Sequence, residues 1–94
     1  MTTAERIEAR LREALAPTHV EIVDDSAKHV GHAGAAGGGH FSCLVVSDAF
    51  RGLGAVERHR AVYAALGALM RHEIHALALE TATTEEWKTA RRVG

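Results

Sequence analysis

A segment rich in glycine, alanine and histidine interrupts this chain and limits where a hydrophobic core can form. It runs from Asp24 to Gly39 and is followed by His40-Phe41. Glycine and alanine side chains cannot fill a core, so we predict a flexible loop here and a core built from the residues on either side. His29, His32 and His40 lie in or beside the loop. Imidazoles carried on a flexible loop are typical of a site that binds something.

The residues before the loop predict one helix and one strand. Thr2 and Glu5 have the spacing of a capping box, and apolar residues then recur three or four positions apart until a proline ends the pattern. Val20 and Ile22 alternate with polar residues, as in a half-buried strand. After the loop, residues 40–46 are rich in β-branched and aromatic side chains. They predict a second strand that pairs with the first as a hairpin.

The second half of the chain predicts a turn, a long helix and a third strand. Residues 47–54 indicate a turn with a short helical piece, anchored by Phe50 and Leu53. A helix from Ala55 to Met70 is predicted to bury a wide apolar face. That face comprises Val56, Val62, Tyr63, Leu66, Leu69 and Met70. Residues 74–79 predict a strand apolar enough on both sides to lie centrally or under a helix.

A short polar turn of helix, from Thr83 or Thr84 through Trp87, is predicted after this strand. The predicted fold class is therefore α+β, a single small domain in the order helix-strand-strand-helix-helix-strand. A three-stranded sheet is packed by the helices.

Composition limits the classes of function. The 94 residues include 11 basic and 12 acidic side chains, a net charge of -1, so no overall field draws the chain to nucleic acid or membrane. Cys43 is the single cysteine, which excludes an intramolecular disulfide and favours a reducing compartment. The longest apolar run, residues 61–70, is half the length needed to cross a bilayer, and the charged N-terminus does not resemble a secretory signal. We therefore expect a cytoplasmic protein.

The sequence offers little for catalysis. We find no carboxylate pair, nucleophile-base set or phosphate loop at workable spacing, so we expect no enzyme. Asp24 and Asp25 are adjacent, and consecutive strand-end residues point to opposite sides, so they are expected to shape the loop. Cys43 alternates with Phe41 and Val45 and is expected to be buried and inert.

A glycine motif of nucleic-acid-binding domains is also present, at Gly34-Ala35-Ala36-Gly37. That motif clamps phosphates from a turn between two helices, whereas here it lies between two predicted strands. The corresponding turn is expected near Gly52-Leu53-Gly54, which lacks the spacing.

An ordered set of motifs resembles the BolA family. These motifs are residues 24–29, Gly39-His40-Phe41, Val46-Ser47 with Phe50 and Gly52, Arg58-His59-Arg60, and Ile74-His75-Ala76-Leu77. The resemblance runs from Ile7 to Trp87. It implies a fold similar to the second class of KH domain, with residues 1–94 as a single BolA-like domain and residues 24–39 as its histidine- and glycine-rich loop.

The resemblance implies a role in iron-sulfur trafficking or iron-linked regulation, in partnership with a monothiol glutaredoxin. In the family a [2Fe-2S] cluster is shared with the glutaredoxin cysteine and glutathione, and histidines of the BolA-type protein supply the other ligands. Carried over to this chain, these ligands are His75 and the loop histidine His29. His32 in the same loop is the alternative to His29. One cysteine cannot hold such a cluster alone, so the chemistry also requires a partner.

The rival hypothesis is a DNA-binding transcriptional regulator that uses the KH-like surface. Arg51, Arg58, Arg60 and Arg71 could form a basic strip, with binding that is weak and falls steeply with salt. His40 is expected to hold the loop end or face solvent, and His59 to be structural or to face a partner. The free chain is expected to be a monomer or a weak homodimer.

Overall fold

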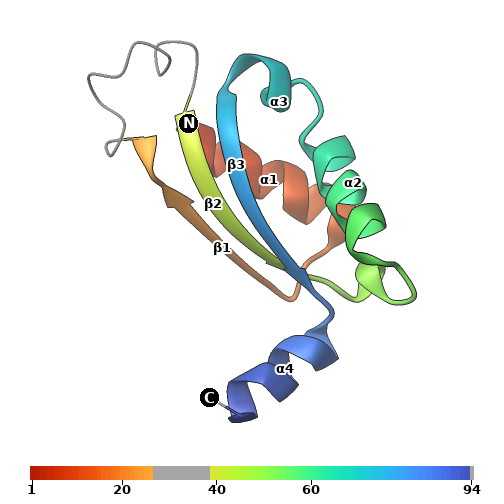
Figure 1. Cartoon of the computed structure of the whole chain (residues 1–94). Helices are drawn as coiled ribbons and strands as arrows, with labels where there is room; N and C mark the ends of the chain where they lie inside the picture. Colours follow the sequence, from red (N-terminus) through yellow and green to blue (C-terminus); the bar gives the residue numbers. More distant parts are fainter. Residues whose placement is uncertain (27–38, 94) are drawn as a thin grey trace.

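The computed structural model describes residues 1–26 and 39–93 and shows an α+β fold (Figure 1). The elements, in chain order, are α1 (Thr3–Leu15), β1 (His19–Asp24), β2 (Gly39–Val46), the 3-10 helix η3 (Asp48–Phe50), α2 (Ala55–Leu66), α3 (Leu69–His72), β3 (Ile74–Ala82) and α4 (Thr84–Val93). The predicted fold class and the predicted capping box of the first helix are confirmed. No helix within the described residues is long and apolar enough to cross a membrane.

The three strands form one sheet with β2 in the centre. β1 pairs antiparallel with β2, as the predicted hairpin requires, and β3 pairs parallel with β2. β3 is an edge strand with exposed alternate residues, so the central position predicted for it was wrong, but its other face lies under α2 and α3, which was the second predicted position. Ala76 and Ala78 made the strand resemble a doubly buried one, but alanine is small enough to be exposed at little cost.

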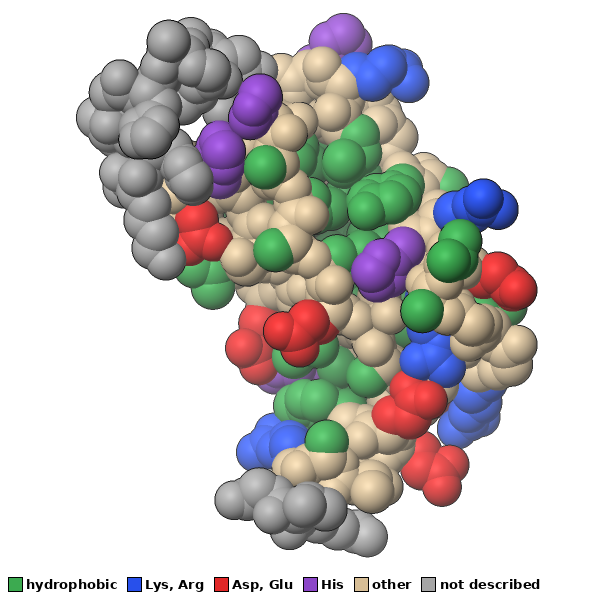
Figure 2. Space-filling model, in the orientation of Figure 1, with side chains coloured by type: hydrophobic (Ala, Val, Ile, Leu, Met, Phe, Trp, Pro, Cys, Tyr) green, Lys and Arg blue, Asp and Glu red, His purple; other side chains and the backbone are tan. Residues whose placement is uncertain are grey.

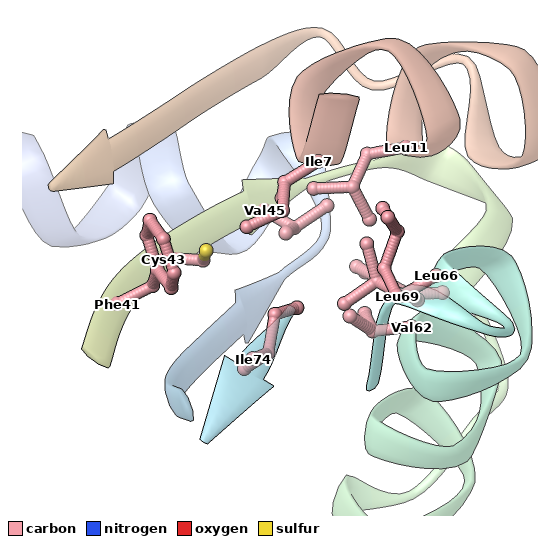
Figure 3. Packing of buried hydrophobic residues seen from close by; sticks show 10 residues of the cluster. Ile7, Leu11, Phe41, Cys43, Val45, Val62, Leu66, Leu69 and Ile74 are labelled. Carbon is pink, nitrogen blue, oxygen red and sulfur yellow. The ribbon is translucent and has the colours of Figure 1, made fainter. Parts of the chain in front are cut away.

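One face of the sheet is covered by helices and holds the core (Figure 3). Ile7 and Leu11 of α1 pack there with side chains of β2, α2 and α3. On β2 these are Phe41, Cys43 and Val45, which alternate with half-buried residues. Cys43 is 4% exposed, which confirms its predicted burial, and desolvation raises the pKa of its thiol to about 11. The thiol is therefore protonated at neutral pH.

The predicted helix from Ala55 to Met70 is interrupted. α2 ends at Leu66, and Gly67 has a φ of 54°, a left-handed conformation that turns the chain before α3. Val56 and Tyr63 are 63% and 41% exposed, so their predicted burial was wrong. Both residues lie in α2, where only Val62 and Leu66 are buried, so the buried face of this helix is narrower than predicted. The predicted turn near Gly52–Gly54 is present between η3 and α2, and Gly67 and Ala68 form a second turn between helices, from α2 to α3.

The last helix is longer than the short turn that the sequence predicts. α4 has ten residues, and Figure 1 shows it beyond the end of β3, away from the layer of α1 and α2. Reciprocal hydrogen bonds begin it: the backbone N–H of Thr83 donates to Glu86 Oε1 at 2.8 Å, and that of Glu86 donates to Thr83 Oγ1 at 3.1 Å. Trp87 stacks on His19 of β1 with ring centroids 4.3 Å apart. This contact fixes α4 to the sheet.

Candidate metal site

Two histidines meet where β2 and β3 begin. His40 is the second residue of β2, and His75 is the second residue of β3. Their ring centroids are 5.1 Å apart and the rings are tilted by 45°. The strands are parallel, so their first residues lie at the same end of the sheet. The pairing shifts between Gly39, which lies opposite Ile74, and His40, which lies opposite Ala76. His75 is exposed and His40 is half-buried.

Hydrogen bonds hold the chain on both sides of the undescribed segment close to His40. The N–H of Asp25 donates to the carbonyl of His40 at 2.7 Å, and the N–H of His40 donates to Ser26 Oγ at 3.1 Å. Ser42 Oγ donates to Asp25 Oδ2 at 2.6 Å. The Ser26 N–H donates to Asp24 Oδ1 at 2.9 Å, and its hydrogen bonds lower the pKa of Asp24. Asp24 and Asp25 therefore shape the chain at the end of β1, as expected, and His40 is fixed at the start of β2 by its backbone hydrogen bonds.

Glycine is required at the first residue of β2. A Cβ at Gly39 would lie 2.5 Å from Cε2 of Phe41 and 2.9 Å from Ser26 Oγ. The Gly39 N–H donates to the carbonyl of Glu73 at 3.0 Å, which fixes the start of β2 beside the start of β3. A side chain at position 39 would therefore displace Phe41 and Ser26 next to His40.

The spacing of the histidine pair is compatible with two ligands of one metal ion. Two imidazoles that bind one tetrahedral metal through bonds of about 2 Å have ring centroids about 5 Å apart, as these two do. Within residues 1–26 and 39–93, no group of three or more histidine, cysteine or carboxylate side chains could hold a metal. A bound metal would therefore need further ligands beyond this pair. The predicted ligands His29 and His32 lie outside the described residues.

The arginines predicted for nucleic-acid binding have different environments. The Arg58 side chain is 14% exposed; its Nε donates to the Leu53 carbonyl at 2.8 Å, and its Nη1 contacts Glu86 Oε1 at 2.6 Å. This pairing raises the pKa of Arg58 and lowers that of Glu86 to about 2. Arg51 lies 3.4 Å from Asp48, whereas Arg60 and Arg71 are exposed on α2 and α3. Arg58 thus ties α2 to α4.

The sequence did not indicate that the His40 ring lies beside His75. Its position at a strand start is evident from the pattern, but the neighbour of that strand start depends on the pairing of β2 with β3. These strands are separated in sequence by η3, α2 and α3. A parallel partner reached through a helical crossover has no local sequence signature.

Comparison with known proteins agrees with this architecture. The family profile described as BolA-like protein matches residues 11–86. The DNA-binding transcriptional regulator BolA of Escherichia coli (strain K12) is 42% identical over 88 residues, covering 94% of this chain and 82% of the relative. Protein BOLA2 of Arabidopsis thaliana is 42% identical over 89 residues, covering 94% of this chain and 86% of the relative.

A solved structure shares the fold as well. The crystal structure of a Bol-like protein from Babesia bovis superposes with a TM-score of 0.81 at 32% identity, covering 98% of this chain and 96% of the other. The family profile, the relatives and the shared fold lead to one conclusion: the chain belongs to the BolA family.

Proposed function

We propose that this protein is a non-enzymatic adaptor that binds a monothiol glutaredoxin and co-ligates a bridging [2Fe-2S] cluster, in iron-sulfur trafficking or iron-linked regulation. The observation that carries the proposal is the proximity of His40 and His75, with ring centroids 5.1 Å apart at one end of the sheet. Cys43 is buried and supplies no ligand. The remaining ligands come from the partner and glutathione.

In this proposal two histidines of this chain bind the cluster, one from β3 and one from the loop. His75 is the ligand on β3, and His29 is the ligand from the loop, with His32 as its alternative. The geometry adds His40 as a third candidate, because its ring already lies beside His75. Histidine in place of thiolate raises the reduction potential of a cluster, and metal binding by imidazole weakens as the pH falls. A cluster held in this way suits transfer rather than permanent storage.

Cluster transfer between purified proteins tests the proposal. The chain is mixed with cluster-loaded monothiol glutaredoxin and glutathione, and visible absorption and circular dichroism are recorded. The variants are His75→Ala, His29→Ala, His32→Ala and His40→Ala. We expect a new cluster spectrum for the wild type that changes in His75→Ala and in one of the other three, which identifies the second ligand. His72→Ala, an exposed histidine at the end of α3, is the matched control.

The proposal is abandoned if the cluster spectrum is the same with and without the chain. It is also abandoned if all variants give the wild-type spectrum at one-to-one stoichiometry.

The alternative function is DNA-binding transcriptional regulation, which the name of the E. coli relative favours. Arg60 and Arg71 are exposed and could contact phosphates, whereas Arg58 would first have to leave Glu86. The turn between α2 and α3 has one glycine, Gly67, where the phosphate-clamping motif has two. Titration with duplex DNA at increasing salt separates the two functions. Sequence-specific affinity at physiological salt that is reduced in Arg60→Ala and Arg71→Ala favours this alternative.

A further inference from the structure

The face of the sheet opposite the helices carries an open groove. Its cavity volume is about 290 Å³. Val23, on this face, is 54% exposed, although solvated sheet faces usually carry polar side chains. Apolar and small residues form the floor between two carboxylates. The side chains that line it on this face are Glu21, Val23, Ser42, Leu44, Ala78 and Glu80.

The strand register places two carboxylates on either side of one leucine. Glu21 of β1 lies opposite Leu44 of β2, and Leu44 lies opposite Glu80 of β3. Alternate strands of a sheet are about 10 Å apart, so the two glutamates flank Leu44 in a single row. Glu21 contacts His19 at 2.6 Å, and no ion pair joins Glu80 to another described residue. No lysine or arginine is among the described residues that line the groove.

The open face that carries the groove extends from the histidine pair at one end to α4 at the other. Along β2, His40, Ser42 and Leu44 alternate with the buried core residues, so all three share the open face. A second groove of about 430 Å³ shares Leu44 and Glu80 and extends to Trp87, Ala90 and Arg91 of α4. Figure 2 shows histidines at one end of this face, acidic side chains over its middle and α4 beyond them.

We propose that this open face is the docking surface for the protein that shares the metal site, and that the partner places a lysine or arginine side chain over Leu44, between Glu21 and Glu80. The inference rests on the proposed function, because a partner that binds the same metal as His75 must cover this end of the sheet. Ser42 and Ala78 are small and allow the partner surface to approach closely. The partner surface around the basic side chain is apolar, to match Val23 and Leu44.

The size of the face fits a transient complex. Three strands, each about 4.8 Å wide, and eight residues of about 3.3 Å each give a footprint of roughly 380 Å². Stable complexes bury about 800 Å² per partner, so this contact is weak and reversible even with a contribution from α4. In such an interface the acidic pair selects the partner and speeds association, and its effect decreases with salt.

Charge reversal tests the docking surface. Glu21→Lys/Glu80→Lys is titrated with cluster-loaded monothiol glutaredoxin, and the midpoint of the cluster circular dichroism signal is compared with that of the wild type. We expect the midpoint to rise at least tenfold at low salt and the difference to shrink at high salt, with the same spectrum at saturation. Glu13→Lys/Glu57→Lys, which makes the same charge change on exposed positions of α1 and α2, should stay within threefold of the wild type.

The outcomes separate the two proposals. A wild-type midpoint for Glu21→Lys/Glu80→Lys, or an equal loss in the Glu13→Lys/Glu57→Lys control, overturns the docking surface and leaves the shared cluster intact. If the wild type itself gives no cluster signal with the glutaredoxin, the proposed function and the docking surface both fail. Far-ultraviolet circular dichroism and the thermal midpoint confirm that each variant is folded.

Discussion

Ser47 is a polar residue in the core that joins three parts of the chain. Its side chain is fully buried; Oγ donates to the Leu15 carbonyl at 2.6 Å and accepts from the Ala49 N–H at 3.0 Å. Its own N–H donates to the carbonyl of Ala82 at 2.9 Å. The Ser47 hydroxyl therefore bonds a carbonyl at the C-terminus of α1 and caps the N-terminus of η3, directly after the last residue of β2.

We expect Ser47→Ala to lower the free energy of unfolding by about 1–3 kcal/mol, because the Leu15 carbonyl and the Ala49 N–H lose their partner while buried. Urea denaturation followed by circular dichroism measures this change. Thr89→Ala, at an exposed position of α4, is the control and should change stability by less than about 0.5 kcal/mol. Equal stability of the Ser47 variant and the wild type would show that water replaces the hydroxyl.

Gly39→Ala should impair both folding and the proposed metal site. The added methyl would overlap Phe41 and Ser26, so we expect a loss of about 1–3 kcal/mol in the free energy of unfolding. The backbone shift would also separate His40 from His75 and weaken cluster binding. Gly54→Ala is the matched control, since a Cβ there meets no atom within 4 Å and its φ of -78° suits alanine. A fully stable Gly39→Ala variant with normal cluster binding would contradict the assigned role.

At the scale of elements, α4 is attached to the rest of the molecule by a few side-chain contacts. Glu86 accepts from Arg58 of α2 and from the Thr83 backbone. Trp87 stacks on His19, and the guanidinium carbon of Arg91 lies 4.6 Å from the centroid of the Trp87 ring. None of these contacts belongs to the core cluster. The position of α4 therefore depends on charge and on ring stacking.

Acid should release α4 through Glu86. The folded-state pKa of this carboxyl is about 2, below the value of 4.5 expected without its partners. Its contribution to stability is therefore complete above about pH 4.5 and is lost as the pH falls toward 2. Trp87 is the only tryptophan, so its fluorescence reports this change directly. In the Glu86→Gln variant, the change in Trp87 fluorescence between about pH 4.5 and pH 2 should be smaller than in the wild type. Glu85→Gln, on the same turn of α4, should leave this change as it is in the wild type. A transition that Glu86→Gln leaves unaltered would assign the release to other carboxyls.

At the scale of the whole molecule, Cys43 reports the integrity of the core. Its thiol is 4% exposed and its pKa is raised to about 11 by burial. A thiol reagent at pH 8 should therefore label the native protein only through unfolding, with a rate that rises as urea is added. Cys43→Ala should keep the full cluster spectrum with glutaredoxin while losing about 1 kcal/mol of stability. Fast labelling in native buffer, or loss of the cluster spectrum, would contradict the assignment of Cys43 to the core.

Local patterns in the sequence predicted the elements whose signals lie within a few residues. The capping box and the apolar spacing predicted α1, and the alternation of apolar and polar residues predicted β1 and β2. The helix from Ala55 to Met70 was predicted too long because apolar residues continue past Gly67, whose positive φ cannot be read from the pattern. The edge position of β3 was missed because alanine is compatible with both exposed and buried positions.

The sequence by itself determined the order of the elements, the burial of Cys43 and the histidine candidates His29, His32 and His75, because these follow from residue type, spacing and resemblance to the family. Only the tertiary structure decided that His40 lies beside His75, that Arg58 is held by Glu86, and that Glu21 and Glu80 flank Leu44 on an open face. Each of these contacts joins residues at least 23 positions apart in the chain. Their geometry depends on the parallel pairing of β2 with β3 and on the path of the helical crossover, which the packing of the whole core fixes.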